Sequence, residues 1–323
     1  MIIPRLASII YKYIGPGRDR KKLSIFIYHR VLSKHDELLP YEITLPEFDW
    51  HLNLIKKHFT VLELADAIAA IKSNSLPANA ACITFDDGYH DNYSNALPLL
   101  KKYNLPATFF VATKFLNGGI MWNDQVRETL RSLSAERLDL NELNLGQYDF
   151  SNSSERHQAV ESVINKLKYF PFVERQNVVD ELNSILNIER PRGLMMTDGE
   201  VRLMRASGMG IGGHTVSHPI LSSLNAKDAE NEINDNKATL ESILGEKIEI
   251  FAYPNGKPGQ DYTKESVSLV KRAGYIGAVS TSWGVSTSGT DVYQIPRFTP
   301  WDRSQNKYML RLCRNVFNKP EFV

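Results

Sequence analysis

The stretch Ala80-Ala-Cys-Ile-Thr-Phe-Asp-Asp-Gly88 joins a short apolar run to two adjacent carboxylates and a glycine. The run over residues 80–85 predicts a buried strand, because it is short, apolar and ends at a turn signal. An Asp-Gly pair after a strand is ordinary turn chemistry, so Asp86 and Asp87 alone are a weak sign of function. Gly88 permits a sharp bend, which can bring both carboxylates into one pocket despite the alternation of a strand.

Short apolar runs alternate with amphipathic stretches along most of the chain. Further strands are predicted at residues 23–28, 106–111, 208–213, 248–253, 276–280 and 292–295. Helices are predicted over 45–55, 92–103, 227–244 and 264–273, and the last two end at Gly245 and Gly274. This alternation is typical of an α/β fold with parallel strands, and in a barrel version the chemistry lies at the carboxyl ends of the strands.

One region breaks this alternation. Val111 and Met209 are separated by about a hundred residues, too many for a single crossover helix. Helical patterns occupy residues 123–134, 154–169 and 173–186 of this region. We therefore predict a helical insertion at about 117–200, and interpret it as a lid or a specificity element.

Composition excludes several classes of protein. The 323 residues are 42% hydrophobic, enough for a sizeable core, and the net charge of +1 predicts no attraction to nucleic acid. Two cysteines, Cys82 and Cys313, do not make a disulfide framework. No apolar run reaches the roughly 18 residues of a membrane span, so none is predicted.

The first 22 residues form a separate N-terminal segment in this interpretation. Its apolar stretch is short and broken, and it lacks the architecture of a signal peptide. A short amphipathic element packed on the protein and a weak contact with a membrane surface both stay open. The predicted location is cytoplasmic or peripheral to the membrane.

A second motif, His214-Thr-Val-Ser-His218, follows the Gly-rich strand at 208–213. On a helical turn, residues four apart share one face at roughly 5–6 Å, so both imidazoles can close on one metal ion. One carboxylate of the Asp pair would complete three protein ligands, as in catalytic zinc sites, and the other is free to act as a base. Two surface histidines are the alternative, but both motifs follow predicted strands, which favours the metal site.

Other polar residues lie at the same predicted edge. His29 follows the first strand, and Tyr253-Pro-Asn-Gly256 follows another. A proline and a glycine around one residue fix a rigid backbone whose amide can face an oxyanion. Trp283 and Trp301 fit either a sugar-binding groove or the core.

Taken together, Thr84-Phe-Asp-Asp-Gly88, His214-Thr-x-x-His218 and Phe251-Ala-Tyr-Pro-Asn-Gly256 resemble, in this order, the motifs of the polysaccharide deacetylase family, carbohydrate esterase family four. The resemblance covers most of residues 23–300 outside the insertion. It implies a distorted (β/α)7-type barrel with a helical insertion. The predicted division is an N-terminal segment (1–22), a barrel (23–310) and a C-terminal tail (311–323).

The resemblance also implies roles for individual residues. Asp86 is expected to be the general base, and Asp87, His214 and His218 to bind a divalent metal, usually Zn²⁺, with cobalt, nickel or iron as alternatives. The backbone amide of Tyr253 is expected to stabilise the oxyanion. Tyr253, Asn255 and Trp283 are the expected substrate-binding residues.

Two departures from the family pattern affect these roles. Ala252 stands where many members have an arginine that steers the base, and Ile295-Pro-Arg297 stands where many have a late Leu-x-His that supplies the acid. The chain resembles instead the bacterial poly-N-acetylglucosamine deacetylases, whose acid is an early histidine of a Tyr-His motif, here Tyr28-His29. We expect Arg297 to take the steering role.

The function implied is metal-dependent removal of N-acetyl groups from a sugar or polysaccharide of the N-acetylglucosamine type, with release of acetate, in surface-polysaccharide metabolism. The expected partner is a carbohydrate. Two alternatives stay open: the same fold and metal acting on a small amide or an O-acetyl substrate, and an inactive carbohydrate-binding relative.

Overall fold

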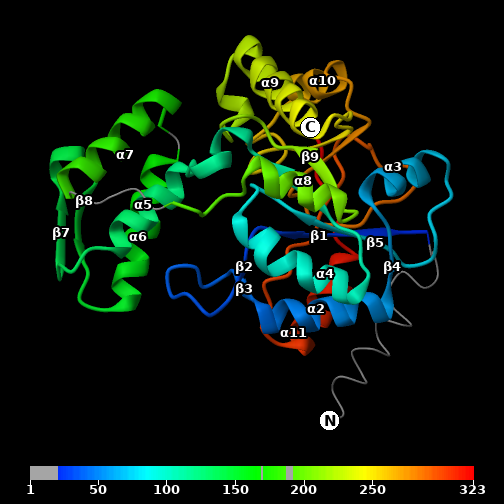
Figure 1. Ribbon diagram of the computed structural model, residues 1–323, viewed down its shortest axis with the longest axis horizontal. Helices are drawn as coiled ribbons and strands as arrows, with labels where there is room; N and C mark the ends of the chain where they lie inside the picture. The colour runs from blue at the N-terminus through cyan, green and yellow to red at the C-terminus, as the bar shows by residue number, and fades with distance from the viewer. Residues whose placement is uncertain (1–20, 169, 187–191) are drawn as a thin grey trace.

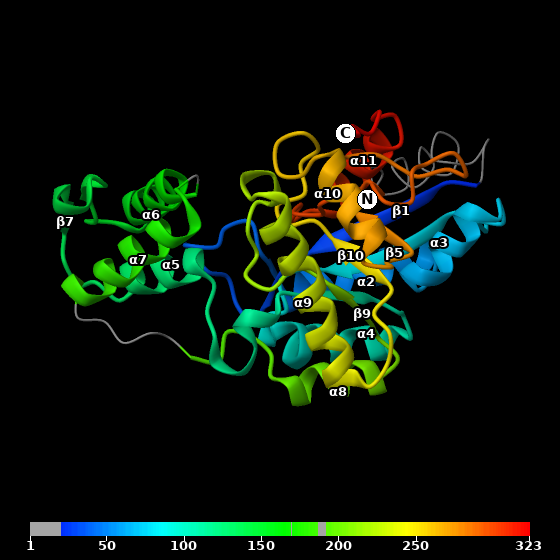
Figure 2. The same cartoon turned by 90° about the horizontal axis from the view of Figure 1, so that it is seen from above.

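The structure is a computed structural model that describes residues 21–168, 170–186 and 192–323. A parallel sheet curls into an open half-barrel, and a smaller lobe stands beside it (Figures 1 and 2). The first 20 residues of the predicted N-terminal segment lie outside the described part of the chain. No helix among the described residues has the length and apolar character needed to cross a membrane.

The sheet has the strand order β1-β5-β6-β9-β10-β11, and every pair in it is parallel. Its strands are β1 (Leu23–Tyr28), β5 (Ala80–Phe85), β6 (Thr108–Val111), β9 (Gly210–Gly213), β10 (Ile250–Ala252) and β11 (Gly277–Val279), with β4 (Thr60–Val61) paired to β5. The predicted α/β barrel is confirmed. The strands predicted at 23–28 and 80–85 match residue for residue, and the others are shorter than predicted.

The strand predicted at 292–295 does not form. This segment makes only isolated parallel bridges, Val279 with Ile295 and Phe26 with Phe298. Pro296 lies between them and has no N–H to donate, so a continuous ladder cannot form. The segment 292–298 nevertheless fills the gap between β11 and β1, because Ser280 N–H donates to Ile295 and Ile27 N–H to Phe298.

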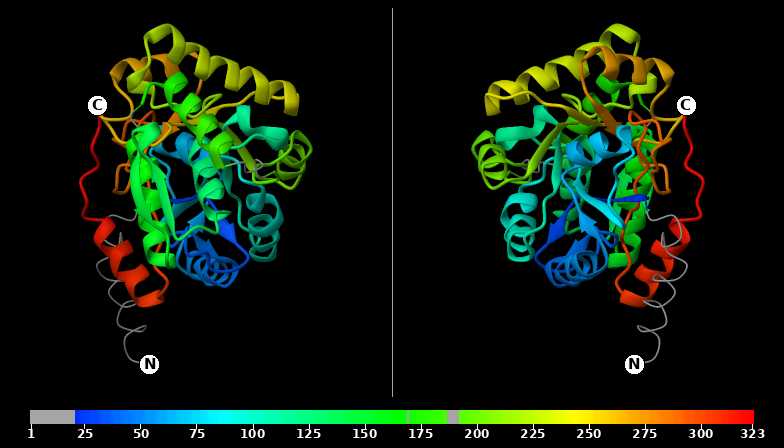
Figure 3. Two further views of the ribbon diagram at one scale, coloured as in Figure 1. Left: turned by 90° about the vertical axis from the view of Figure 1, so that its left-hand side faces the viewer. Right: turned by 90° about the vertical axis from the view of Figure 1, so that its right-hand side faces the viewer.

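Helices pack around the sheet. They are α2 (Leu45–His58), α3 (Leu64–Lys72), α4 (Leu97–Tyr103), α8 (Asp198–Ala206), α9 (Ala226–Leu244), α10 (Lys264–Arg272) and α11 (Gln305–Asn315). Gly245, at φ 71°, ends α9 as predicted. Helices α9 and α10 lie at the opposite end of the molecule from α11 (Figure 3). The predicted boundary at residue 310 falls inside α11.

The helix predicted over 92–103 begins differently. Asn92–Ala96 form a π-helical turn, and α4 follows it. The side chain of Asn92 donates to the carbonyl of His29, and that of Asn95 to the carbonyl of Val31. This turn therefore fixes the segment that follows β1, including the short strand β2 (Val31–Leu32), which pairs with β3 (Ile43–Thr44).

The lobe is built from the predicted insertion. It contains α5 (Trp122–Arg131), β7 (Arg137–Leu140), β8 (Gly146–Asp149), α6 (Ser153–Leu167) and α7 (Phe172–Leu186), around a core of its own. The antiparallel hairpin β7–β8 was not predicted. Its signal is the alternation Arg-Leu-Asp-Leu in β7, whose leucines are buried, and its tight turn uses left-handed backbone at Asn144 and Gly146.

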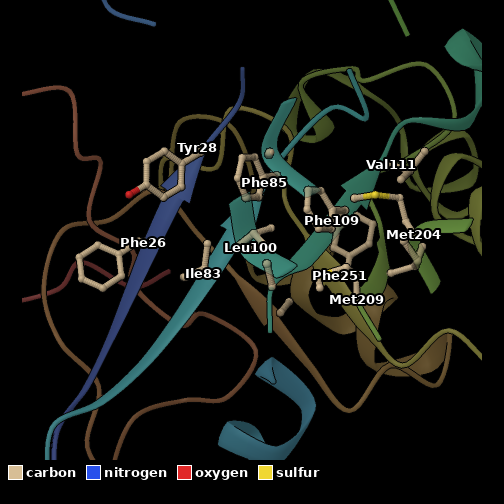
Figure 4. Packing of buried hydrophobic residues seen from close by; sticks show 14 of the residues in the cluster. Phe26, Tyr28, Ile83, Phe85, Leu100, Phe109, Val111, Met204, Met209 and Phe251 are labelled. Atoms are coloured by element: carbon tan, nitrogen blue, oxygen red, sulfur yellow. The ribbon is translucent and has the colours of Figure 1, made fainter. Parts of the chain in front are cut away.

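Aromatic rings fill the main core of the barrel. Tyr28, Phe85 and Phe109 stack in sequence across β1, β5 and β6, with ring centroids 5.3 and 4.7 Å apart (Figure 4). Strand β9 packs too closely for a side chain at Gly212, because a Cβ atom there would lie 2.5 Å from the ring of Phe110. Cys82 and Cys313 are buried free thiols.

His51 generates a prediction about pH. Its ring is buried beside Tyr28, and burial lowers its pKa to about 3 despite a hydrogen bond to the Asp302 carbonyl. In the unfolded chain His51 gains a proton near pH 6.5, whereas in the native protein it stays neutral until about pH 3. The free energy of unfolding therefore falls as the pH drops from about 6.5 towards 3.

We therefore expect the free energy of unfolding to fall less steeply for His51→Phe than for the wild type between about pH 6.5 and 4.5. The two slopes should differ by up to about 1.4 kcal/mol per pH unit. Denaturant unfolding over a series of pH values measures this slope. Equal slopes for the two proteins would contradict the assignment.

Candidate metal and catalytic site

Three side chains converge as a metal ion requires. The Oδ1 atom of Asp87 lies 3.4 Å from Nε2 of His214 and 3.4 Å from Nε2 of His218. The ligand atoms of all three lie within 4.8 Å of one another. Oδ1 of Asp87 is buried and receives no hydrogen bond from any residue that the structure describes. A buried carboxylate oxygen facing two imidazoles suits a divalent metal such as Zn²⁺.

The two histidines do not lie on a helical turn, which corrects the expectation from their spacing. Residues 214–218 form a loop, with left-handed backbone at Thr215 (φ 63°) and His218 (φ 54°). The loop brings the ring centroids of His214 and His218 to 4.8 Å. The sequence therefore predicted the convergence but not the backbone that produces it.

Helix α9 holds this loop in place. Glu232 accepts hydrogen bonds from the backbone N–H groups of Val216 and Ser217, each at 2.8 Å. Asn236, which is fully buried, accepts from the N–H of His214 at 3.1 Å. Sequence reasoning missed both residues; the only signal was two polar side chains four residues apart on one helix.

The ring orientation of His214 also suits a metal ligand. Its Nδ1 lies 2.8 Å from the carbonyl of Ala252, which leaves Nε2 towards Asp87. Burial opposes protonation of His214, but Asp87 and Asp86 raise its pKa. Burial dominates for His218 and lowers its pKa to about 4, so this ring is neutral at neutral pH.

Asp86 is held by a buried arginine. Arg297 donates from Nη1 and Nη2 to the two carboxylate oxygens, at 2.7 Å each, and from Nε to the carbonyl of Ser280. Burial opposes ionisation of Asp86, but Arg297 and His214 lower its pKa below the usual value. The predicted contact between Arg297 and Asp86 is present, and its part in turnover stays a prediction.

One cavity of about 240 Å³ collects most of the predicted residues. His29 and Asn255 line it together with Asp86 and the three candidate metal ligands. Asn255 has left-handed backbone (φ 57°), and its N–H meets no acceptor among the described residues. The lining residues that the sequence did not indicate are Arg30, Leu39, Glu42, Tyr89, Asn123, Asp124, Arg127 and Thr281.

Besides Arg297, which lies behind Asp86, two predicted residues are absent from the cavity lining. The N–H of Tyr253 donates to the carbonyl of Val279 across the sheet, and its hydroxyl donates to the carbonyl of Tyr293. The oxyanion and substrate-binding roles expected for Tyr253 are therefore corrected, because both polar groups are occupied and the ring is buried. Trp283 is outside the cavity and packs against Trp301, at 5.5 Å between ring centroids.

Sequence comparison places this site in a known group of proteins. The model of the family described as "Polysaccharide deacetylase" matches residues 73–140 and 154–278, which include all three candidate metal ligands and Asp86. The chain belongs to the polysaccharide deacetylase family. The resemblance of its ordered motifs to that family is confirmed.

Individual relatives in this family are distant. The poly-beta-1,6-N-acetyl-D-glucosamine N-deacetylase of Staphylococcus epidermidis is 31% identical over 153 residues, 47% of this chain and 50% of that protein. The protein of the same name from Staphylococcus aureus (strain N315) is 27% identical over 202 residues, 60% of this chain and 68% of that protein. The chain thus spans about half the length of the first relative.

Two solved structures show the same fold. The Streptococcus pyogenes deacetylase PplD, in complex with acetate, has a TM-score of 0.61 and 20% identity over 90% of this chain and 98% of that one. IcaB from Ammonifex degensii has a TM-score of 0.59 and 17% identity over 92% of this chain and 97% of that one.

The buried pair of Asp86 and Arg297 generates a prediction about stability. Removing one partner of a buried ion pair leaves an uncompensated charge, which costs about 3–5 kcal/mol. We expect Arg297→Met to lose stability in this range, measured by denaturant unfolding. The double variant Asp86→Asn with Arg297→Met should recover part of the loss, and a loss below about 1 kcal/mol in the single variant would disprove the coupling.

Proposed function

We propose that this protein is a metal-dependent hydrolase that removes N-acetyl groups from a sugar of the N-acetylglucosamine type and releases acetate. The observation that carries the proposal is one cavity that combines a metal-binding triad with a second, ionised carboxylate and a separate histidine. The staphylococcal relatives, named as poly-N-acetylglucosamine deacetylases, support the same chemistry. The proposed setting is surface-polysaccharide metabolism.

Asp87, His214 and His218 would hold the metal ion. The unpaired buried oxygen of Asp87 and the two Nε2 atoms supply the donor set, which favours Zn²⁺ and also fits cobalt, nickel or iron. A divalent metal bound there would polarise the acetyl carbonyl as a Lewis acid.

Asp86 is the proposed base. Its ionised carboxylate takes a proton from water as the water oxygen bonds to the acetyl carbon. Arg297 donates one hydrogen bond to each carboxylate oxygen and fixes the plane of the carboxylate. Further lone pairs on these oxygens stay available for the water. The N–H of Asn255, in place of that of Tyr253, would donate to the developing oxyanion, and such donors are worth about 3–4 kcal/mol.

His29 is the proposed acid. An amide nitrogen leaves poorly unless it is protonated, and the proton must reach it as the carbon–nitrogen bond breaks. His29 lines the cavity from the end of β1, and its backbone is fixed by the hydrogen bond from Asn92. The products are acetate and a free amine on the sugar.

Substitution of the two carboxylates tests this division of roles. Asp87→Ala should lose the metal, measured by elemental analysis, and with it acetate release. Asp86→Asn should keep the metal and lose at least about a hundredfold in turnover, because proton transfer contributes that much or more. Tyr253→Phe is the matched control and should keep both. Full turnover in Asp86→Asn would remove the base assignment.

A larger groove bears on the alternative substrates. It measures about 900 Å³, lies between the barrel and the lobe, and shares Arg30 with the metal cavity. Asn95 lines it from the barrel, and Arg131 and Arg156 line it from the lobe. A groove beside the cavity, with a lining residue in common, favours a chain of sugars over a small amide or an isolated O-acetyl group.

Chain length therefore provides a separate test. We expect kcat/KM for acetate release to rise at least tenfold from N-acetylglucosamine to its tetramer, because a chain adds contacts along the groove. Equal values along the series would favour the small-substrate alternative. Sugar binding without acetate release, in protein with its metal bound, would favour the non-catalytic alternative.

A further inference from the structure

The lobe contributes directly to the metal cavity. Helix α5 lies on the side of the lobe that faces the barrel (Figure 1), and Asn123, Asp124 and Arg127 from this helix line the cavity. None of the three belongs to the motifs of the barrel. An insertion with its own core therefore completes the wall of a site whose other polar groups come from strand ends.

Asp124 is oriented by two donors. The hydroxyl of Tyr89 donates to its Oδ2 at 2.8 Å, and Arg127 donates to its Oδ1 at 2.9 Å. Asp124 is only 2% exposed, and Tyr89 directly follows Gly88 of the Asp-Asp-Gly turn. A carboxylate has about four lone-pair sites, so two acceptor directions are left for a ligand.

Asn123 offers a second, neutral group. Its side chain is half-buried on the cavity wall, and its amide has no hydrogen-bond partner among the described residues. An amide can donate and accept at once, as a hydroxyl does. Asn123 and Asp124 thus present adjacent donor and acceptor groups to a ligand in the cavity.

The charges in the cavity restrict the kind of ligand. Arg30 pairs with Asp91 at 2.8 Å, and Arg127 pairs with Asp124 and, at 3.4 Å, with Glu161. Both guanidinium groups on the cavity wall are therefore already neutralised by carboxylates. Such a wall suits the hydroxyl groups of a neutral sugar and opposes a sugar acid.

A structural role alone does not account for this wall. A buried ion pair is often no more stabilising than apolar residues of the same volume. The pair of Asp124 and Arg127 lies within α5, and the barrel contacts it through the hydroxyl of Tyr89. Apolar side chains would attach the lobe to the barrel without burying these charges.

We infer that Asp124 and Asn123 bind ring hydroxyls of the acetylated sugar, so that the lobe recognises the sugar while the barrel carries out the hydrolysis. This inference rests on the proposed function. It assigns the substrate as a neutral N-acetylated sugar with its ring hydroxyls intact.

The test compares Asn123→Ala and Asp124→Asn with the wild type on N-acetylglucosamine and on mono-deoxy analogues that each lack one ring hydroxyl. We expect kcat/KM on the parent sugar to fall about fivefold for Asn123→Ala and tenfold to a hundredfold for Asp124→Asn, mainly through KM. Each loss should vanish on the analogue that lacks the bound hydroxyl. Gln158→Ala, on the exposed face of α6, is the control and should change nothing.

The outcomes separate the two levels of the proposal. Equal losses on the parent sugar and on every analogue, together with a lower Tm for Asp124→Asn, would mean that the residues only attach the lobe and would overturn the inference. No acetate release by the wild type from any of these sugars would count against the proposed function. In that case the affinity for N-acetylglucosamine, measured by calorimetry, still decides whether the lobe recognises the sugar. Weaker binding by Asn123→Ala would support the inference, and unchanged binding would overturn it.

Discussion

The buried ion pair between Arg297 and Asp86 is the constraint on which the rest of the site depends. Arg297 is fully buried and belongs to the irregular segment 292–298, which fills the gap between β11 and β1. Its partner Asp86 directly follows strand β5. The pair therefore couples the closure of the barrel to the position and charge of Asp86, and removing either partner would leave a buried charge without compensation.

Several residues with strained backbone also lie at this site. Asp87, Thr215, His218 and Asn255 all have positive φ without being glycine, and three of them line the cavity. Such conformations cost of order 1–3 kcal/mol each, so the surroundings must impose them. The hydrogen bonds from α9 to the loop at 214–218 are one such support. The fold itself therefore supports the positions of the candidate metal ligands.

Because the barrel and the lobe are separate, the two parts differ in how far their sequences can change without disturbing the site. The barrel supplies the candidate metal ligands, Asp86 and His29 from its strand ends, where small displacements matter. The lobe has a separate hydrophobic core, and the lobe residues that the structure describes reach the cavity through α5 alone. Changes within the lobe can therefore alter the cavity wall without disturbing the strands that hold the candidate metal ligands.

The sequence by itself determined the alternation of strands and helices, the insertion, and the convergence of Asp86, Asp87, His214, His218 and His29. Each of these follows from local pattern, because residues that end parallel strands must meet at one edge of the sheet. Only the tertiary structure decided that the amide of Tyr253 donates within the sheet, that Asn255 faces the cavity, and that α5 brings Asp124 to the candidate metal site. Those outcomes depend on contacts between segments far apart in the chain, which no local pattern records.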